Sequence, residues 1–375
     1  MTTVTIDYHD FAALTNGRAR RERTPVSALF ELTPACNLRC KFCYVAIEPY
    51  KGPYLGTAQV IQVLDTLQRA GVLWLSLTGG EIFSRRDFPE IYRAAVARGF
   101  LITLFSNATM ATAEHAALLR ELPPFGVEVS IYGADAEHYE GTTGIPGSFA
   151  RFERGIRLLR DAGVELLLKT PLSTLTADHF EALDAYAANL GVQFKYDMSI
   201  DPRLSGNDEP TIYRIEPRQI PVLADAIHRH KTGKPRVKGP LPECEVTDTG
   251  GANFSKELYY CGAGRVGLFI DALGQASHCV IDREPNYPIL EMPWEDLWAR
   301  MGAWVTQPLP PEAPCSGCGL RSGCQNCPAR SRLATGNSYL KDTYHCDVTH
   351  VLNDLEPAVH PDYRSIGREL AGCVR

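Results

Sequence analysis

The sequence predicts an α/β protein in which a parallel sheet carries helices on its outside, followed by a small cysteine-rich region. Two observations carry this prediction. Short apolar runs alternate with helix-like stretches between residue 27 and about residue 197, and such alternation is typical of serial β–α units. Of the twelve cysteines in 375 residues, none lies between Cys43 and Cys244, and nine lie from Cys244 onward.

Six apolar runs mark the predicted strands, at 28–33, 73–78, 101–106, 126–131, 164–170 and 192–196. Five helix-like stretches separate them, at 58–70, 87–98, 113–121, 149–162 and 178–189. Several of these helices end at a glycine just before the next run, which indicates a helix stop followed by a strand. Six such units leave two options, a closed or partial barrel or a doubly wound sheet. In either one, functional groups gather at the carboxyl ends of the strands.

The β–α pattern breaks from Asp201 onward. One more helix-like stretch lies at 218–230, and 231–242 is predicted to be a linker. The remainder is short, rich in Gly and Pro and dense in Cys, as expected of a small domain held by metal clusters rather than by a large core. We therefore expect an N-terminal segment at 1–25, the β–α domain at 26–235, a cysteine-rich domain at 240–350 and a C-terminal tail at 351–375.

Composition excludes several classes of partner and suggests a compartment. The chain has 38 basic and 44 acidic residues, so neither nucleic acid nor an anionic membrane is expected as a partner. The first residues lack the apolar core of a signal peptide, and no run is long and apolar enough to span a bilayer. We expect a cytoplasmic protein, where metal or cluster ligation explains twelve cysteines better than disulfides do.

The first predicted strand runs directly into a loop with three cysteines, Cys36-x3-Cys40-x2-Cys43. Three thiolates on one short loop can wrap one face of a cubane iron–sulfur cluster and leave the fourth iron without a protein ligand. An open iron allows a cluster to bind and reduce a substrate rather than only to relay electrons. A zinc knuckle with a distant fourth ligand is the alternative, and the position at the end of a strand in a β–α array disfavours it.

This loop resembles that of the radical S-adenosylmethionine (SAM) superfamily, and the resemblance covers most of the chain. It implies a partial (β/α)6 TIM-like barrel with a catalytic [4Fe–4S] cluster on Cys36, Cys40 and Cys43. The amino and carboxylate groups of SAM chelate the fourth iron in that family. The radical formed from SAM abstracts a hydrogen from the substrate, and the protein supplies positioning and exclusion of water.

Further residues match positions that contact SAM in the family. The 79–81 segment matches its GGE element, since glycine lets backbone approach a ligand and a carboxylate can pair with an ammonium. The alternative role of Asn107 and Ser130 is to cap the ends of their strands. The alternative for Lys169 is that its apolar stem packs at the strand end while its ammonium reaches solvent. The predicted cofactor-binding residues are Phe42, Gly79, Gly80, Glu81, Asn107, Ser130 and Lys169.

The later cysteines resemble the SPASM extension of radical SAM enzymes, which carries two auxiliary [4Fe–4S] clusters. One departure is visible, because two residues rather than three precede Cys327 in the quartet. A zinc site on the two Cys-x2-Cys pairs is the alternative, although it leaves other cysteines unexplained. Family pairing gives the first auxiliary cluster Cys261, Cys279 and Cys327 with Cys244 as fourth ligand, and the second Cys315, Cys318, Cys324 and Cys346.

The resemblance implies a net oxidation, because auxiliary clusters can take the second electron from the substrate. The segments 130–133 and 144–149 resemble enzymes that modify ribosomally made peptides by a crosslink, a thioether or dehydrogenation. Val280 follows Cys279 where sulfatase-maturing relatives have Asp, so that activity is not expected. The alternatives are a dehydrogenase or epimerase of a small molecule such as a sugar or cofactor precursor, and an iron–sulfur electron carrier without SAM chemistry.

An external electron donor of the flavodoxin or ferredoxin type is the expected partner of such an enzyme. Only 35 residues precede Cys36, too few for a winged-helix leader-recognition domain, so we expect a separate leader-binding protein or another surface to bind a leader peptide. Polar residues past the sixth strand and near the later cysteines are candidate substrate acids or bases. The two predicted catalytic residues are Asp282 and Asp197, and the further candidates are Asp201, Arg203, Tyr259 and Tyr260.

Overall fold

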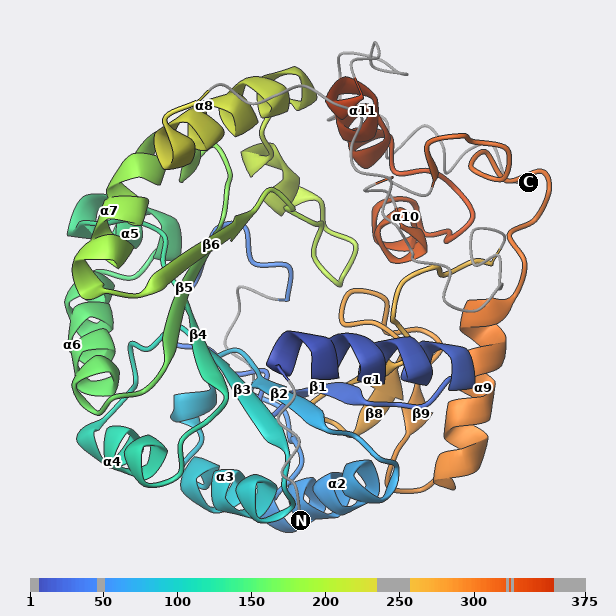
Figure 1. Cartoon of the computed structure of the whole chain (residues 1–375), viewed down its shortest axis with the longest axis horizontal. Helices are drawn as coiled ribbons and strands as arrows, with labels where there is room; N and C mark the ends of the chain where they lie inside the picture. The colour runs from blue at the N-terminus through green and yellow to red at the C-terminus, as the bar shows by residue number, and fades with distance from the viewer. Residues whose placement is uncertain (1–6, 46–50, 235–256, 322–323, 325–326, 354–375) are drawn as a thin grey trace.

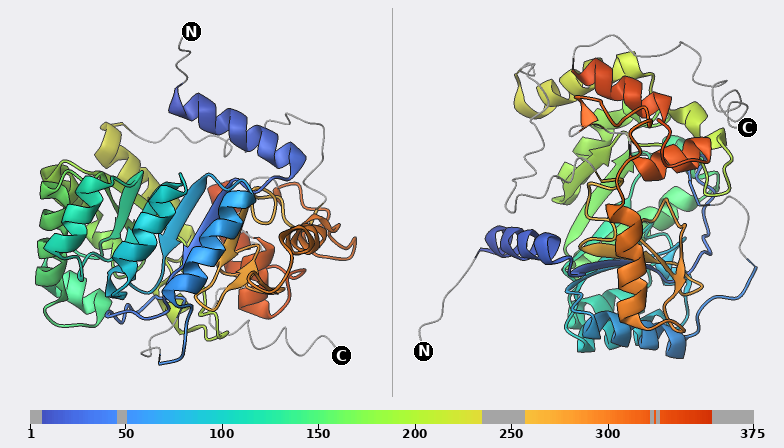
Figure 2. Two further views of the ribbon diagram at one scale, coloured as in Figure 1. Left: turned by 90° about the horizontal axis from the view of Figure 1, so that it is seen from below. Right: turned by 90° about the vertical axis from the view of Figure 1, so that its right-hand side faces the viewer.

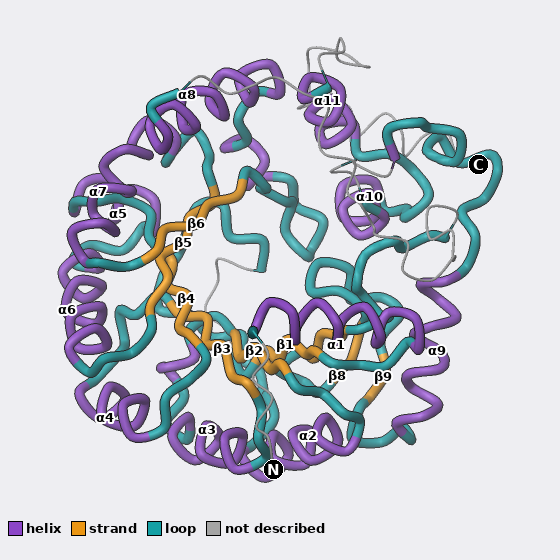
Figure 3. The backbone as a smooth tube through the Cα atoms, viewed as in Figure 1, coloured by secondary structure: helices purple, strands orange, loops and turns teal. Residues whose placement is uncertain are grey.

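The chain folds as a ring in which an arc of strands, with helices on its outside, faces the C-terminal region (Figure 1). A computed structural model describes residues 7–45, 51–234, 257–321, 324 and 327–353. Strands β1 to β6 form the inner layer on one side of the ring, and Figure 3 shows the helices outside them. The C-terminal region occupies the other side (Figure 1).

Six parallel strands follow one another in sequence order across the sheet. They are β1 (Ser27–Glu31), β2 (Trp74–Thr78), β3 (Leu101–Ser106), β4 (Gly126–Ser130), β5 (Leu166–Pro171) and β6 (Gln193–Asp197). A doubly wound sheet reverses its strand order at a switch point, and this sheet does not. The predicted partial barrel is therefore confirmed, and the doubly wound alternative is wrong.

The helices between these strands cover the outer face of the sheet (Figure 1). They are α2 (Thr57–Arg69), α3 (Phe88–Ala97), α4 (Ala113–Glu121), α5 (Ala136–Thr143), α6 (Ser148–Asp161) and α7 (Phe180–Leu190), and α8 (Ile220–Thr232) follows β6. Short 3-10 turns lie at Ile82–Ser84, Ala177–His179, Glu209–Tyr213 and Pro217–Gln219. The helix α5 was absent from the prediction, because its sequence lacks the apolar period of a packed helix.

Fully buried and half-buried residues alternate along the strands, so the two faces of the sheet differ in burial. Leu75, Leu77, Leu104 and Val127 point outward and are fully buried, and burying each such side chain contributes roughly 1.5–3 kcal/mol. The residues between them are only half-buried in β2, β3 and β4. The concave face is therefore less buried than the face that the helices cover.

An N-terminal helix that the sequence did not predict, α1 (Tyr8–Glu22), packs across the amino-terminal end of the sheet. The Nε1 atom of Trp74, at the start of β2, donates to the Tyr8 hydroxyl at 3.0 Å, and the Tyr8 ring lies 5.0 Å from that of Phe125. Figure 2 shows α1 on the outside of the body rather than within it. Few of its residues are buried, so its own pattern carried little signal.

The C-terminal region extends the sheet and then completes the ring. Strand β7 (Gly267–Ile270) pairs parallel to β1, and β8 (Gln275–Ser277) and β9 (Tyr287–Pro288) continue antiparallel. Helices α9 (Trp294–Thr306), α10 (Pro328–Thr335) and α11 (Thr343–Leu352) follow. Tyr344 and Val348 of α11 share an apolar cluster with Ile220 and Ile227 of α8. The region thus contacts the barrel on both its β1 and its β6 sides.

Among the helices that the structure describes, none combines the length and the apolar character needed to cross a bilayer.

Candidate active site

The three-cysteine loop leaves the carboxyl end of β1 and is held by backbone contacts on two sides. The amide of Gly80 donates to Thr33 O at 2.8 Å and that of Glu81 to Ala35 O at 2.9 Å, which joins the loop to the end of β2. On the other side, Arg39 N donates to Thr143 O at 2.9 Å, at the end of α5. The sheet and a neighbouring helix therefore both fix the loop, and its own Asn37 and Arg39 side chains add hydrogen bonds to Thr109 Oγ1 and Cys36 O.

Gly79 and Gly80 are required by the packing of this loop. A Cβ on Gly79 would lie 2.6 Å from Thr33 O, and one on Gly80 would lie 2.3 Å from Ala35 O and 2.8 Å from Cys36 Cβ. Such distances leave no room for a side chain. The sequence prediction assigned these glycines to a ligand's approach, whereas the contacts that exclude a Cβ are made by the cysteine loop itself.

Glu81 is fully buried and accepts three hydrogen bonds from the chain. Its Oε1 receives Phe83 N at 3.0 Å and Ser106 Oγ at 2.8 Å, and its Oε2 receives Asn107 N at 2.7 Å. Burial raises the pKa of this carboxyl, while these three donors lower it. Glu81 ties β2 to the end of β3. The predicted pairing of this carboxylate with a ligand ammonium stays a prediction.

The thiols of Cys36, Cys40 and Cys43 lie close enough to affect one another. Burial raises the pKa of the Cys36 thiol to about 11, with smaller contributions from Glu81 and Cys43. Burial also raises the pKa of Cys40, and Cys43 and Cys36 add to that shift. Cluster binding must overcome these pKa shifts, because thiolates are the ligands. Asn107 Nδ2 lies 3.8 Å from Cys36 Sγ and can donate to it.

An orphaned hydroxyl behind the loop supports the fit of an iron–sulfur cluster. Tyr139 is fully buried, and among the described residues its hydroxyl has no hydrogen-bond partner. After burial, the groups that raise its pKa most are Cys40, Glu81 and Cys36. A buried hydroxyl without a described partner, in the electrostatic surroundings of these thiols, suits a sulfur-rich, negatively charged group. No three Cys, His, Asp or Glu side chains in the described ranges are arranged to hold a single metal ion.

Phe42 and Ser130 meet at one aromatic side chain, Tyr132. The Phe42 ring is buried and lies edge-on to the Tyr132 ring at 5.2 Å. The Tyr132 hydroxyl interacts with Ser130 and with the Cys40 thiol, and burial raises its pKa well above the ordinary value. Sequence reasoning did not single out Tyr132 as a site residue, although it lies in the 130–133 segment that carried part of the family resemblance.

Lys169 lies on the concave face of β5 and is paired. Its Nζ is 2.9 Å from Glu128 Oε2 on the neighbouring strand β4 and 3.6 Å from the centre of the Phe105 ring on β3. Burial lowers the pKa of Lys169, while Glu128 raises it. Asp197 ends β6, and its Oδ1 accepts from Ser199 N at 2.8 Å. Burial raises the pKa of Asp197.

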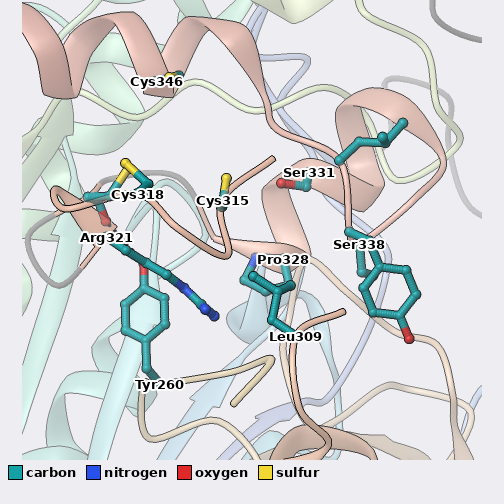
Figure 4. A pocket seen from close by; sticks show the side chains of 12 residues that line it. Tyr260, Leu309, Cys315, Cys318, Arg321, Pro328, Ser331, Ser338 and Cys346 are labelled. Atoms are coloured by element: carbon teal, nitrogen blue, oxygen red, sulfur yellow. Dashed lines mark hydrogen bonds between the residues drawn. The ribbon is translucent and has the colours of Figure 1, made fainter. Parts of the chain in front are cut away.

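Four cysteines of the C-terminal region line one cavity (Figure 4). Figure 4 shows Cys315 and Cys318 on loop backbone and Cys346 on the helix above them. Tyr260 lines the same cavity and donates from its hydroxyl to Cys324 O at 3.2 Å. Burial raises the pKa of Cys346 to about 11. The cysteines of this cavity are Cys315, Cys318, Cys324 and Cys346, the set that family pairing gave to one auxiliary cluster.

A second group of thiols lies nearby. Burial raises the pKa of Cys327 to about 12, and Cys279 and Cys261 contribute to that shift. The predicted fourth member, Cys244, lies outside the described residues. None of the ten cysteines that the structure describes forms a disulfide.

Asp282 lies inside the C-terminal region and is 3% exposed. The Tyr259 hydroxyl donates to its Oδ2, His278 Nε2 is 3.5 Å from Oδ2, and Arg332 Nε is 3.6 Å from Oδ1. These contacts favour a structural role for this carboxylate. The predicted acid–base roles of Asp282 and Asp197 stay predictions, and Asp197 is the one of the two that lies at the end of a barrel strand.

Residues 30–187 match the family model of the radical SAM superfamily. The AdoMet-dependent heme synthase of Oleidesulfovibrio alaskensis is 32% identical over 183 residues, which are 48% of this chain and 47% of that protein. The AdoMet-dependent heme synthase of Methanosarcina barkeri is 26% identical over 334 residues, 84% of this chain and 95% of that protein. The sporulation killing factor maturation protein SkfB of Bacillus subtilis is 28% identical over 277 residues, 73% of this chain and 64% of that protein.

Among solved structures, Streptococcus suis SuiB bound to its precursor peptide SuiA superposes with a TM-score of 0.68 at 14% identity, over 91% of this chain and 82% of SuiB. SuiB bound to S-adenosylmethionine gives 0.63 over 90% and 83%. At this identity the likeness concerns the fold. The aligned segment spans about half the length of the first heme synthase. Residues 30–187 therefore form a radical SAM domain.

Proposed function

Because the chain carries a radical SAM domain, we propose that it abstracts a hydrogen from a ribosomally made peptide and completes an oxidative modification of it. The proposal also assigns Cys36, Cys40 and Cys43 to the catalytic cluster and the later cysteines to two auxiliary clusters. An external electron donor starts each turnover by reducing the catalytic cluster.

The observation that carries this proposal is the gathering of Cys315, Cys318, Cys324 and Cys346 around one cavity, apart from the loop at the end of β1. Hydrogen abstraction leaves a substrate with one unpaired electron. A net oxidation is complete only when that electron leaves and, for a dehydrogenation, a proton leaves with it. A second cluster site in the same chain gives the electron an acceptor.

When bound, a reduced cluster and SAM supply the 5′-deoxyadenosyl radical that removes the hydrogen. The chain positions these partners. The Glu81 amide donates to Ala35 O in the loop that carries the thiols, while its carboxylate accepts from Ser106 and Asn107 at the end of β3. Lys169 and Glu128 stand as an ion pair on the concave face, where a substrate can approach. Asp197, whose pKa is raised by burial, is suited to accept the proton that leaves the substrate.

Two features favour a peptide as the substrate. SkfB is named as a maturation protein, and the SuiB structure of the same fold holds a precursor peptide. The inner residues of β2, β3 and β4 are half-buried, which suits an open site for a chain segment better than a sealed cavity.

A second candidate substrate is a small carboxylated cofactor precursor. The heme synthase of Methanosarcina barkeri aligns over 95% of its length, so the likeness includes the C-terminal region as well as the barrel. In this reading the same radical step removes a hydrogen from a heme precursor.

The test uses the full chain, reconstituted anaerobically with iron and sulfide and supplied with dithionite and SAM. Formation of 5′-deoxyadenosine supports radical SAM chemistry. Perdeuterated candidate peptide and perdeuterated heme precursor are then compared, because deuterium enters 5′-deoxyadenosine only from the true substrate. Deuterium from the peptide supports the proposal, and deuterium from the heme precursor alone overturns its substrate class. Absence of 5′-deoxyadenosine overturns the radical mechanism for this chain.

A further inference from the structure

The loop that follows β6, residues 198–208, contacts both the catalytic cysteine loop and the C-terminal cysteine region. It is here called the linking loop. Sequence reasoning considered Asp201 and Arg203 only as candidate substrate acids or bases. Their contacts indicate a different role.

On the catalytic side, the linking loop holds the backbone at the third cysteine. Arg203 is 5% exposed, and its Nη1 donates to Cys43 O at 2.8 Å. The next residue, Leu204, donates from its amide to Tyr44 O at 2.8 Å. Glu209 Oε2 lies 3.3 Å from Arg203 Nη2 and balances part of its charge. Two consecutive residues of one loop thus fix the last cysteine of the motif and the residue that follows it.

On the other side, the linking loop is bound by Arg330 of α10, three residues after Cys327. Arg330 Nη2 donates to Ser199 Oγ at 2.7 Å, and its Nε donates to Asp201 Oδ1 at 3.3 Å. The Arg330 and Asp201 side chains are 19% and 12% exposed, so solvent screens this pair little.

A third contact reaches the helix of Cys346. Arg214 Nε donates to Ile200 O at 2.7 Å, and its Nη2 lies 3.7 Å from Asp342 Oδ2. Asp342 in turn caps α11, since its Oδ1 accepts Tyr344 N at 3.1 Å. The linking loop therefore contacts the catalytic motif and the helix after Cys327 directly, and it reaches the helix that carries Cys346 through Arg214.

We propose that the linking loop sets the position of the catalytic cysteine loop relative to the auxiliary cysteines, with Arg203, Arg214 and Arg330 as positioning residues. The inference rests on the proposed function, in which an electron passes from the substrate to an auxiliary site. Electron transfer slows steeply with distance, so a shift of either cysteine group lowers the rate. A charge-assisted buried contact resists such a shift more than a neutral one does.

The experiment is hydrogen–deuterium exchange on the reconstituted full chain, comparing wild type with Arg330→Gln. The substitution removes the cation held by Asp201 and Ser199, and the Leu204 amide is expected to exchange about tenfold faster, as the loss of a charged hydrogen bond allows. Segment 43–45 is expected to become less protected as well, although it lies on the other side of the linking loop from Arg330. Iron content is measured on the same samples.

The matched control is Arg332→Gln on the same helix, because Arg332 contacts Glu284 O and Asp282 within the C-terminal region. Its exchange at 199–208 is expected to equal that of wild type. If Arg330→Gln loses iron, the same exchange comparison is made with Asp201→Asn, because asparagine keeps the shape of the side chain. Unchanged exchange at 203–204 in a variant with full iron content overturns the inference. A low iron count in wild type instead overturns the proposed auxiliary clusters. The exchange rates at 203–204 still test whether the linking loop has its positioning role.

Discussion

The two groups of cysteines in this chain are built in opposite ways. Cys36, Cys40 and Cys43 fall within eight residues on one loop, which hydrogen bonds to the β2 end and to α5 hold in place. Around the C-terminal cavity, Cys346 comes from α11, a helix that packs against the barrel, and the others come from the loop between α9 and α10. The first site lies on a single loop, whereas the second combines a loop with a helix that is docked against α8.

This difference has a functional meaning in the proposed reaction. A site formed by one loop beside a sheet depends mostly on nearby contacts, to which the linking loop adds hydrogen bonds at Cys43 O and Tyr44 O. A site assembled by docking depends on contacts such as those of Arg214 and Arg330. The two sites can therefore be disabled separately, and each prediction below uses that separation.

The largest expected effect separates the two sites by removing one thiol from each. Cys40→Ala is expected to lower 5′-deoxyadenosine formation by about 100-fold or more, because a cluster with two protein ligands is not retained. Cys346→Ala is expected to lose iron as well but to keep SAM cleavage. Both quantities are measured on anaerobically reconstituted protein. Equal loss of SAM cleavage in the two variants would contradict the functional separation of the two sites.

The next effect compares two glycines that flank the two groups of cysteines. Gly80→Ala places a Cβ 2.3 Å from Ala35 O, and such overpacking typically costs about 1–3 kcal/mol of unfolding free energy. Gly317→Ala meets no described atom within 4 Å and is expected to leave stability unchanged. Urea unfolding of the metal-free chains measures both. A Gly80→Ala chain as stable as wild type would contradict the observed packing.

A dependence of folding stability on acid pH is expected from the C-terminal cysteine site and not from the catalytic loop. Burial raises the pKa of Asp342, but His345 and Arg214 outweigh it and lower the pKa to about 2. A lowered carboxyl pKa stabilises the folded state above the unfolded value near 4 and loses that contribution as the pH falls toward 2. Asp342→Asn is therefore expected to destabilise the chain at pH 7 by on the order of 2 kcal/mol.

The measurement is urea unfolding of metal-free wild type and Asp342→Asn at pH 7, 5 and 3. The difference between the two chains is expected to shrink from pH 5 to pH 3, since other carboxyls titrate alike in both. A difference that stays constant over this range argues against the Asp342 contacts as the cause.

The smallest effect concerns the orphaned hydroxyl behind the catalytic loop. Tyr139→Phe removes a buried group without a described partner, so stability is expected to stay within about 1 kcal/mol of wild type. If the hydroxyl donates to the cluster or its thiolates, its loss makes reduction harder and shifts the catalytic potential to more negative values. Potentiometric titration followed by electron paramagnetic resonance reads this shift. If the signals of the auxiliary clusters shift and the catalytic signal does not, the hydroxyl does not donate to the catalytic cluster.

Sequence reasoning predicted the barrel because its signals are local. Alternating apolar positions and glycine stops define each β–α unit within some thirty residues, and the six strands appear where they were expected. The helices α1 and α5 were missed because they bury few residues and have little apolar period. The parallel pairing of β7 with β1 joins residues about 240 positions apart, and no local pattern encodes that.

The residues of the candidate site likewise divide into those with a local sequence signal and those without one. The cysteine spacing and the GGE element identify the catalytic loop, because their chemistry depends on adjacent residues. The reason for the two glycines was not predictable, since it lies in the carbonyls of Thr33 and Ala35. Arg330 carried no signal at all, because its partners Ser199 and Asp201 lie about 130 positions away and act through side-chain geometry alone.

The central claim is that one chain holds a catalytic cluster site and two separate auxiliary sites. The most direct test is a count of iron and acid-labile sulfide per chain after anaerobic reconstitution. The account predicts about twelve of each, four for every cubane cluster. About four of each, with SAM cleavage intact, would contradict the auxiliary sites and leave only the loop at the end of β1.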